Sequence, residues 1–560
     1  MVNTTKLFKA MTAIRDQTRE IPMVKPVGFK FPYEMAYEGQ STVIQELQGF
    51  EQASLASPTG SGKTAIFMSL TRDTPSIIIE PRKFLQKQVQ TYYNDYVLFG
   101  RSEYPCFHAA NAAIAPCNRK IPCDQVHRPE ECRSAKETCE KTDCKVFLKG
   151  ADVFSFPCRD CEYIKAQIEA ARVLKDKGTV ICNFGNFWQL LKHAKVVVID
   201  EADLFFREIS KPTKMNYSDK DAVDDTISEI LMREKSGLEA AIKNGTAATT
   251  YSLQNLLYNV NFLLGHKELC FKYQRKGRRG GDKIYIEISP DSVNVLKDKI
   301  FKGKRLLIVS ATLGEFDIPR HSYSVWQRRA TFYCPVAKLT STNFKKNPWI
   351  MDQVAEQIET ISTIAEGMFD THKFPVHCGN LGTHAVAINN LLGPDRKHLL
   401  CATCNQAIPD ISPEAQMIRC PECGKKWNVL EEKCTLHSAG NLMKTIENFA
   451  VSDSRYLLIA GADYGGDFSW ATLQFIIKYP YASLDERMRV LQRVMGPDKF
   501  DNYYKNDAQS RFIQQCGRVC RGAGDVGFTV VFDSKMMEEY QRNKNNYPSW
   551  FKETFDGICY

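Results

Sequence analysis

Residues 57–64 have the side chains and spacing of a phosphate-binding loop. They read Ser-Pro-Thr-Gly-Ser-Gly-Lys-Thr, with Ser57 where the usual pattern has glycine. In such loops the backbone N–H groups and the following helix N-terminus hold the phosphates. Lys63 would neutralise the β and γ oxygens, and Thr64 would bind magnesium. The predicted phosphate-binding residues are Ser57, Pro58, Thr59, Gly60, Ser61, Gly62, Lys63 and Thr64.

A second motif, at residues 196–203, supplies paired carboxylates. It reads Val-Val-Val-Ile-Asp-Glu-Ala-Asp, an apolar run that is typical of a buried strand. Asp200 would complete the magnesium site, and Glu201 would polarise an attacking water molecule. A lone Gly-rich loop is often only a turn between a strand and a helix. Both motifs in this order predict a protein that hydrolyses a nucleoside triphosphate.

Residues near the C-terminus could form the opposite wall of such a site. Residues 514–521 read Gln-Gln-Cys-Gly-Arg-Val-Cys-Arg, and Arg518 and Arg521 would share one helix face. From a second domain, Gln514 and these arginines could act at the γ-phosphate. Without the phosphate loop, a surface salt-bridge pair would be the simpler interpretation. Asp463 lies in a Gly-rich turn that we expect to face the same cleft.

Composition and charge limit the class of protein. The chain has 560 residues, of which 43% are hydrophobic and 25% charged, so we expect several globular domains. The net charge of +9 permits a polyanionic partner without requiring one. No apolar run reaches the roughly 18–20 residues that a membrane helix needs. We therefore expect no membrane partner and a cytoplasmic protein, nuclear if eukaryotic and not secreted.

Short apolar runs alternate with helical stretches and predict an α/β fold. Continuous apolar runs suit parallel strands that are covered on both faces. They form two sets, which predict two tandem, doubly wound parallel-sheet domains. The expected strands are Ser76–Glu80, Thr179–Cys182, Val196–Asp200, Leu306–Ser310, Pro375–Gly379, Tyr456–Ala460, Leu473–Lys478 and Phe528–Phe532.

Three segments interrupt this pattern and are interpreted as insertions. The first is Cys-rich, at about 102–163, and the second, at about 206–285, has helical periodicity at 227–241 and 253–264. The second also holds a basic run at 272–279, which is usually a solvated loop and only sometimes a nucleic-acid contact. The third is a cysteine module at 397–428. The predicted domain limits are 1–101, 164–205 and 286–330 for the first motor domain and 331–560 for the second.

The cysteine module has the spacing of a zinc ribbon. Two Cys-x-x-Cys pairs are separated by fifteen residues, and each pair suits a tight turn whose thiolates point at one tetrahedral ion. Four thiolates leave no open position for water, so the zinc would be structural. The predicted zinc ligands are Cys401, Cys404, Cys420 and Cys423.

The first insertion holds eight cysteines, which suit either of two kinds of metal. Clustering in a reducing compartment favours metal binding over disulfides. Spacing alone leaves open whether they bind two zinc ions or one iron–sulfur cluster with spares. The cysteines are Cys106, Cys117, Cys123, Cys132, Cys139, Cys144, Cys158 and Cys161.

With these motifs in place, nearly the whole chain resembles superfamily 2 helicases, and among them the XPD-like and DinG-like iron–sulfur DNA helicases. The phosphate loop resembles motif I, and residues 200–203 resemble motif II, although XPD-like proteins usually have His where this chain has Asp203. Gln40, with the segment at 31–33, resembles the adenine-contacting segment. Further matches are Glu80–Arg82 with Gln86, Ser310–Leu313, Gly461–Asp463 and Gln514–Arg521.

The resemblance implies that the two doubly wound domains are RecA-like motor domains. It also implies an iron–sulfur domain before motif II and a helical arch between motifs II and III, where this chain has its insertions. It therefore favours a 4Fe-4S cluster over zinc for the first insertion. The Cys-x4-Cys spacing resembles that of the DinG-like proteins. The implied ligands are Cys106, Cys139, Cys144 and Cys161, with Cys117, Cys123, Cys132 and Cys158 as spares.

These observations predict an ATP- and Mg²⁺-dependent helicase that moves on single-stranded DNA and opens DNA forks. The 5′→3′ direction is implied only by the resemblance. One alternative is an RNA helicase of the Asp-Glu-Ala-Asp class, although those proteins have His where this chain has Gln514. Another is a zinc-binding adaptor on an inactive ATPase scaffold, which the intact Lys63, Asp200 and Glu201 disfavour.

Overall fold

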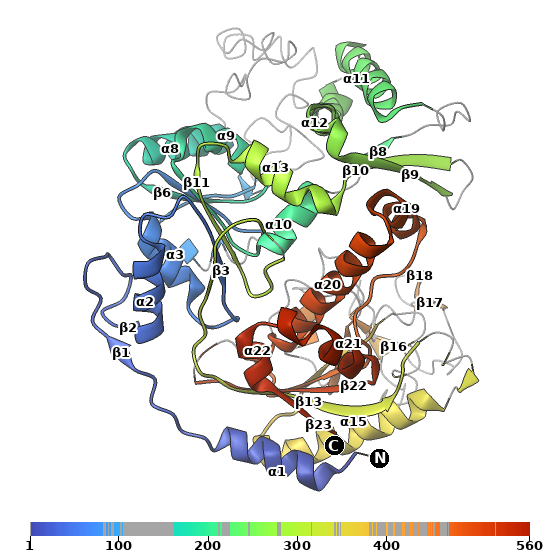
Figure 1. Cartoon of the computed structure of the whole chain (residues 1–560). Helices are drawn as coiled ribbons and strands as arrows, with labels where there is room; N and C mark the ends of the chain where they lie inside the picture. The colour runs from blue at the N-terminus through green and yellow to red at the C-terminus, as the bar shows by residue number, and fades with distance from the viewer. Residues whose placement is uncertain are drawn as a thin grey trace.

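The computed structural model describes the chain in two large α/β units and one insertion (Figure 1). The description omits residues 1, 82–85, 88, 91–94, 101–102, 105–161, 211–212, 216–224, 245–246, 277–281, 315, 341–342, 344–345, 348, 380–383, 385–387, 389–398, 401–406, 409–416, 420–425, 429–433, 436–444, 447, 450, 452–453, 460–467, 469, 521, 523 and 560. The predicted iron–sulfur and zinc ligands, Arg521 and Asp463 thus lie outside the described residues.

The first unit is a parallel sheet in the order β12-β3-β11-β7-β4-β6-β5. Several of its strands are buried along their whole length, as their continuous apolar sequences predict. The strands are β3 (Gln52–Ala56), β4 (Ser76–Ile79), β5 (Tyr96–Leu98), β6 (Thr179–Cys182), β7 (Val196–Ile199), β11 (Arg305–Ser310) and β12 (Arg320–Ser322).

Helices cover both faces of this sheet. One core contains the apolar faces of α2 (Glu38–Leu47) and α3 (Lys63–Thr71). The other contains side chains of α8 (Glu162–Lys175), α9 (Phe187–Leu190) and α10 (Ala202–Ile209), and α13 (Val293–Ile300) packs against it. A short hairpin of β1 (Met23–Val24) and β2 (Ala36–Tyr37) precedes α2. In the strands other than the edge strand β12, neighbouring residues enter opposite cores, as a doubly wound fold requires.

The second unit is also a parallel sheet, in the order β19-β20-β14-β21-β22-β13-β23. Its four predicted strands are confirmed within two residues at each end. The strands are β13 (Arg328–Ala337), β14 (Phe374–His377), β19 (Cys434–Thr435), β20 (Tyr456–Ile459), β21 (Leu473–Ile476), β22 (Val526–Asp533) and β23 (Phe555–Cys559). Its helices are α15 (Ile350–Phe369), α19 (Glu486–Met495), α20 (Pro497–Cys516), α21 (Lys535–Asn543) and α22 (Ser549–Thr554).

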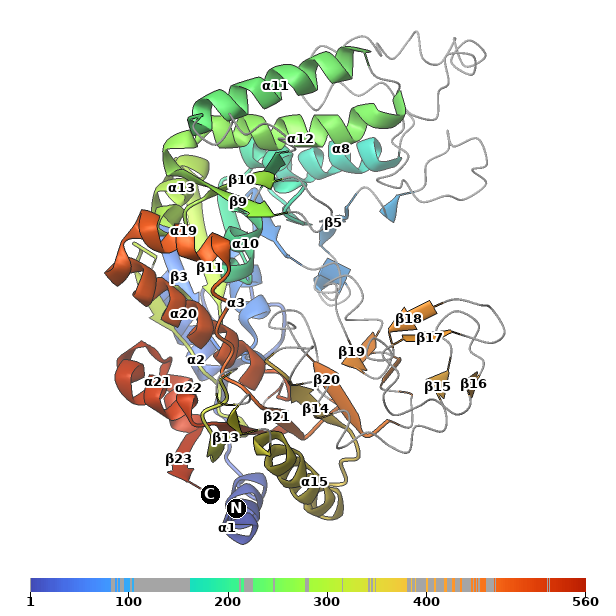
Figure 2. The same cartoon turned by 90° about the vertical axis from the view of Figure 1, so that its right-hand side faces the viewer.

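The first helix, α1 (Thr4–Arg15), belongs to the second unit rather than to the first, in contrast to the predicted limits. Leu7, Phe8 and Met11 are buried in the same core as β13 and α15. Arg15 also donates to the carbonyl oxygen of Met368 at the end of α15 (2.9 Å). Figures 1 and 2 show α1 beside α15, with both termini at this end of the molecule. The apolar stripe of α1 predicts burial, but not the sheet that buries it.

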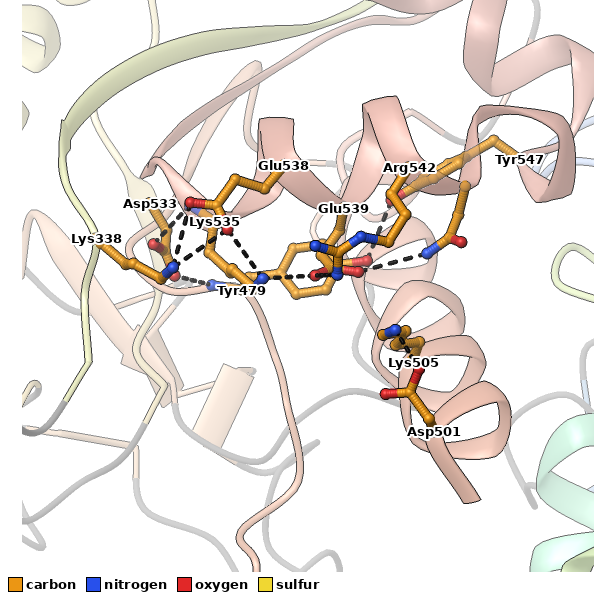
Figure 3. Close-up of polar contacts among 11 residues, drawn as sticks. Lys338, Tyr479, Asp501, Lys505, Asp533, Lys535, Glu538, Glu539, Arg542 and Tyr547 are labelled. Atoms are coloured by element: carbon orange, nitrogen blue, oxygen red, sulfur yellow. Dashed lines mark hydrogen bonds and ion pairs between the residues drawn. The ribbon is translucent and has the colours of Figure 1, made fainter. Parts of the chain in front are cut away.

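Buried Asp533 joins three elements of the second unit (Figure 3). It ends β22, and its carboxylate accepts backbone N–H bonds from Leu339 (3.1 Å), Tyr479 (3.0 Å) and Lys535 (3.0 Å). Those residues follow β13, follow β21 and begin α21. A buried carboxylate that accepts several N–H bonds fixes the strand ends relative to one another. This edge lies opposite the one that meets the first unit's site, because Arg329, which contacts the phosphate loop, pairs with Gly527 at the start of β22.

The insertion between the two halves of the first unit forms a compact lobe. A three-stranded antiparallel sheet, β8-β10-β9, packs against two helices. Its elements are β8 (Thr213–Met215), α11 (Ile227–Asn244), α12 (Ala247–Gly265), β9 (Cys270–Lys276) and β10 (Asp282–Ile288). The predicted helices are confirmed. The basic run was interpreted as a loop, but residues 272–276 form part of β9, and Tyr273 is buried in the lobe's contact with α19.

Two small antiparallel hairpins lie in the segment that holds the second cysteine cluster. β15 (Leu399–Leu400) pairs with β16 (Ala407–Ile408), and β17 (Met417–Arg419) pairs with β18 (Lys426–Asn428). One Cys-x-x-Cys pair follows β15 and the other follows β17. Each pair thus falls between the two strands of a hairpin, the position that the predicted zinc ribbon requires.

Candidate active site

The phosphate loop joins β3 to α3 and is held in shape by its own polar groups. Gly60 and Gly62 both have φ of 79°, a left-handed conformation that glycine adopts without strain. Lys63 is buried, and its ammonium donates to the carbonyl oxygens of Ser57 and Pro58 (both 3.2 Å). The hydroxyl group of Ser61 donates to the carbonyl oxygen of Pro58 (2.8 Å). The loop therefore places one cation at the N-terminus of α3, where anions bind.

Gln40, which lies in α2, supports this loop through hydrogen bonds. Its amide N–H group donates to the carbonyl oxygens of Ser61 (3.2 Å) and Gly62 (3.3 Å), and its oxygen accepts from the backbone of Tyr37 (3.0 Å). A Cβ atom on Gly62 would lie 2.3 Å from the Gln40 amide nitrogen. Glycine is thus required here by both backbone conformation and space.

Asp200 and Glu201 lie at the carboxyl end of β7. This strand pairs with β11, which in turn pairs with β3, the strand that leads into the phosphate loop. Glu201 has φ of 48°, a left-handed conformation that is uncommon for a residue other than glycine and clusters at functional sites. The backbone N–H of Glu201 donates to the Asp200 carboxylate (3.0 Å). Burial raises the pKa of Asp200, the Glu201 charge adds to the rise, and the Lys63 charge opposes it.

A third carboxyl group, Glu80, lies beside Asp200 at the end of the neighbouring strand. β4 and β7 pair with Ile79 opposite Ile199, so Glu80 and Asp200 follow matched positions. Glu80 is 1% exposed, and burial raises the pKa of its carboxyl group well above the usual range, with the Asp200 and Glu201 charges adding to the rise. The sequence pointed to Glu80 only through the resemblance.

Residues 310–312, at the carboxyl end of β11, connect the carboxylates to the second unit. The Asp203 carboxylate accepts hydrogen bonds from the hydroxyl groups of Ser310 (3.0 Å) and Thr312 (2.6 Å). The Gln514 amide N–H group, from α20 of the second unit, donates to Thr312 Oγ1 (3.0 Å) and to the Glu201 carboxylate (3.4 Å). The structure thus brings Gln514 to the carboxylates, as the sequence predicted.

The second unit also contacts the phosphate loop itself. A Cβ atom on Gly517 would lie 3.4 Å from Thr59 Oγ1. Gln327 immediately precedes β13, and Arg329 lies at its start. Their side chains donate to the carbonyl oxygen of Thr59 (3.1 and 3.4 Å). Arg518 is 6% exposed, one turn beyond Gln514. Sequence reasoning missed Gln327 and Arg329, because polar residues before an apolar run are also typical of ordinary loops.

Among the described residues, no group of three or more His, Cys, Asp or Glu side chains could hold a metal ion. In the same residues, no helix combines the length and apolar content of a membrane-spanning segment. Neither finding extends to the cysteine clusters, whose residues lie outside the described part of the chain.

Comparison with known proteins places this arrangement in context. Residues 416–554 match the helicase C-terminal domain family. No curated protein sequence matches the chain.

Similar solved structures include an XPD helicase, which has 12% sequence identity and a TM-score of 0.50, with 91% of this chain and 97% of that chain covered. An apo XPD structure has 11% identity and a TM-score of 0.47, covering 90% and 98%. The Xpd4 structure from S. tokodaii has 11% identity and a TM-score of 0.46, covering 93% and 98%. The chain therefore shares the overall fold of the first of these XPD helicase structures, and its second half contains the match to the helicase C-terminal domain family.

Proposed function

We propose that the chain is an ATP-dependent DNA helicase that moves 5′→3′ on single-stranded DNA. The observation that carries the proposal is the contact of Gln514 with both Thr312 and Glu201. It joins a side chain of the second unit to the carboxylates of the first at the edge of the phosphate loop. A nucleotide bound there would touch both units, so its hydrolysis would change how they sit together.

Each residue has a distinct role in this proposal. Lys63 and the loop N–H groups would bind the β- and γ-phosphates. Thr64 and Asp200 would hold Mg²⁺, which would supply positive charge to offset that of the phosphates. Glu201 would orient the attacking water molecule. Gln514, Arg518 and Arg521 would act on the γ-phosphate from the opposite wall. The buried carboxyl groups around Asp200 suit a site that binds a divalent cation, because a cation offsets their charge.

The metal centres form the second part of the proposal. Cys401, Cys404, Cys420 and Cys423 would bind one structural zinc ion, and the β15–β16 and β17–β18 hairpins support this assignment. Cys106, Cys139, Cys144 and Cys161 would bind a 4Fe-4S cluster in the insertion before motif II. Single-stranded DNA would be the track and DNA forks the substrate, with contacts to backbone and bases that have little sequence preference.

The test is steady-state ATP hydrolysis with and without single-stranded DNA, for the wild-type protein and Lys63→Ala. We expect single-stranded DNA to stimulate hydrolysis and Lys63→Ala to lower the rate at least about 100-fold, because a buried cation at the phosphates is lost. Lys9→Ala, at an exposed lysine of α1 that lies outside this site, is the matched control. Stimulation by RNA alone would favour an RNA helicase, and absence of hydrolysis would favour an adaptor.

A further inference from the structure

Two polar side chains interrupt the apolar sequences of neighbouring strands in the middle of the second unit's sheet. His377 ends β14, which reads Phe-Pro-Val-His, and Gln474 lies in β21, which reads Leu-Gln-Phe-Ile. Gln474 is fully buried, and His377 is 3% exposed. A buried amide or imidazole destabilises a fold unless it is hydrogen-bonded, so the partners of this pair indicate what it does.

The Gln474 amide connects three elements of the second unit. Its Nε2 group donates to the carbonyl oxygen of Gln515 in α20 and to Thr529 Oγ1 in β22 (both 2.8 Å). Because a carbonyl oxygen only accepts, the contact with Gln515 fixes which end of the amide donates. Gln474 Oε1 therefore accepts from His377 Nε2 (3.1 Å). Burial lowers the pKa of His377 to about 4, and the bond to Gln474 opposes that fall, so the ring is neutral near pH 7.

The Gln515 carbonyl group lies in the turn that carries the site residues of α20. The same oxygen also accepts the backbone N–H of Arg518 (3.2 Å). The adjacent Gln514 donates to the first unit, at Thr312 and Glu201. The last carbonyl groups of a helix have no partner farther along the helix. The bond from Gln474 thus fastens the end of α20 to the sheet, one residue from the contact between the two units.

A second contact holds the same turn from its other side. The His377 ring packs edge-on against the Phe468 ring, with their centroids 5.8 Å apart. The backbone N–H of Phe468 donates to the carbonyl oxygen of Arg518 (3.3 Å). Both ends of the turn at 515–518 are therefore tied to one buried polar pair, through Gln474 at one end and through Phe468 at the other.

We propose that Gln474 is a positioning residue for nucleotide hydrolysis, which holds the end of α20 so that Gln514 reaches the carboxylates of the first unit. This inference rests on the proposed function, because the reaction that Gln514 serves is hydrolysis of the nucleotide bound at Lys63. Gln474 acts through the backbone of Gln515. A side chain rooted in a strand that is covered on both faces is a rigid support, and displacement of a site residue by about 1 Å can slow a reaction up to about 100-fold.

Steady-state ATP hydrolysis with single-stranded DNA, measured over a range of Mg-ATP concentrations, tests this role. Gln474→Met removes the amide and keeps an unbranched side chain of similar length. We expect it to lower kcat about tenfold and to leave KM within about twofold of the wild-type value, since the phosphate loop is untouched.

Thr529→Val is the matched control, because it removes the other acceptor of the same amide and leaves the bond to Gln515. It should lower the melting temperature but keep kcat within about twofold of the wild-type value. A pair that only stabilised the sheet would give the two variants the same kcat.

A double variant shows whether Gln474 acts through Gln514. Gln514→Ala alone should lower kcat, and adding Gln474→Met should lower it less than about twofold further, because the side chain that Gln474 positions is already gone. If Gln474→Met does not fold, His377→Phe replaces it. That variant keeps a ring against Phe468 and removes the donor that orients the Gln474 amide, so kcat should fall about threefold, again with little further loss beside Gln514→Ala.

Two outcomes would overturn the inference. A kcat of Gln474→Met, or of His377→Phe in its place, that equals the kcat of Thr529→Val means that the amide only stabilises the sheet. Losses that multiply with the loss of Gln514→Ala mean that Gln474 does not act through Gln514. A wild-type protein that hydrolyses no ATP would instead refute the proposed function, and this inference with it.

Discussion

At the residue scale, Asp203 and Thr312 form the link between the carboxylates and the second unit. Thr312 Oγ1 donates to Asp203 and accepts from Gln514, so one hydroxyl group serves both units. Ser310 contacts Asp203 without reaching Gln514. The two hydroxyl groups can therefore be tested against each other.

We expect Thr312→Val to lower the rate of ATP hydrolysis about tenfold, with little change in nucleotide affinity. Valine keeps the shape but removes the hydroxyl group, which leaves the Asp203 carboxylate and the buried Gln514 amide without that partner. Ser310→Ala, the matched control, should cost about threefold, because the Thr312 bridge remains. Steady-state kinetics with separate binding titrations would check this. A Ser310→Ala variant slower than Thr312→Val would contradict the bridge.

The Asp203 carboxyl group also predicts how activity depends on pH. Burial raises its pKa to about 6, and the hydrogen bonds from Thr312 and Ser310 oppose the rise. Because the folded-state pKa is raised, this group favours folding most at low pH, and that contribution is lost as pH rises to about 6. Lowering the pH through 6 protonates Asp203 and should therefore slow ATP hydrolysis. Protonation of Asp203 should not itself unfold the protein. Asp203→Asn at pH 8 should be slower than wild type at pH 8 but faster than wild type at pH 5, where the raised pKa of Asp200 removes a second charge. A wild-type rate for this variant at pH 8 would contradict the role.

The sequence predicted the phosphate loop, the carboxylate pair and Gln514, because their residue types and spacing are demanded by phosphate chemistry. It did not predict Gln327, Arg329 or the Glu80 contact. Their roles depend on which strand ends and hinge residues meet in space, and their local sequence has no periodic signal.

At the element scale, α20 connects the site to the inserted lobe. Its 20 residues span about 30 Å, with Gln514 near one end and Phe500 near the other. Phe500 packs with α19 and with Phe271 and Tyr273 of β9. Midway, Asp507 pairs with Arg511 and with Arg207, which lies one turn after Asp203 in α10. In Figures 1 and 2, α19 lies beside the β9–β10 hairpin.

The contact between α19 and the lobe contains a buried ion pair that can be measured. Arg487 pairs with Glu287 of β10 at 2.5 Å, and the Glu287 side chain is fully buried. Arg487→Met should lower the free energy of unfolding by about 3 kcal/mol, because it strands a buried carboxylate. The double variant Arg487→Met with Glu287→Leu should recover most of that loss. Denaturant unfolding would check both, and a double variant less stable than Arg487→Met would contradict the explanation.

The sequence largely predicted which segments form strands and helices, but it did not predict which partners those elements pack against. The apolar runs predicted the parallel strands, since only strands covered on both faces tolerate such sequences. The stripe on α1 predicts a buried face, but its partner is β13, more than 300 residues away. The basic run at 272–276 pairs with β10, because tertiary packing against α19 outweighs its polar composition.

At the scale of the whole molecule, the chain combines two motor units with two cysteine clusters. The clusters predict metal content directly. Anaerobically purified protein should contain about four iron and four sulfide ions and about one zinc ion per chain. Cys401→Ser should remove zinc alone and Cys106→Ser iron alone, while Cys270→Ser, outside both clusters, should change neither. A protein that contains about three zinc ions per chain and no iron would contradict the iron–sulfur assignment.

Strand separation on duplexes with a single-stranded 5′ or 3′ DNA tail most directly tests the central claim that the two units form a DNA-opening motor. With anaerobically purified protein and ATP, we expect opening of the 5′-tailed duplex alone and no opening by Lys63→Ala. Opening of the 3′-tailed duplex alone would contradict the proposed direction while leaving the motor intact. Opening by Lys63→Ala equal to that of the wild type would contradict the motor itself.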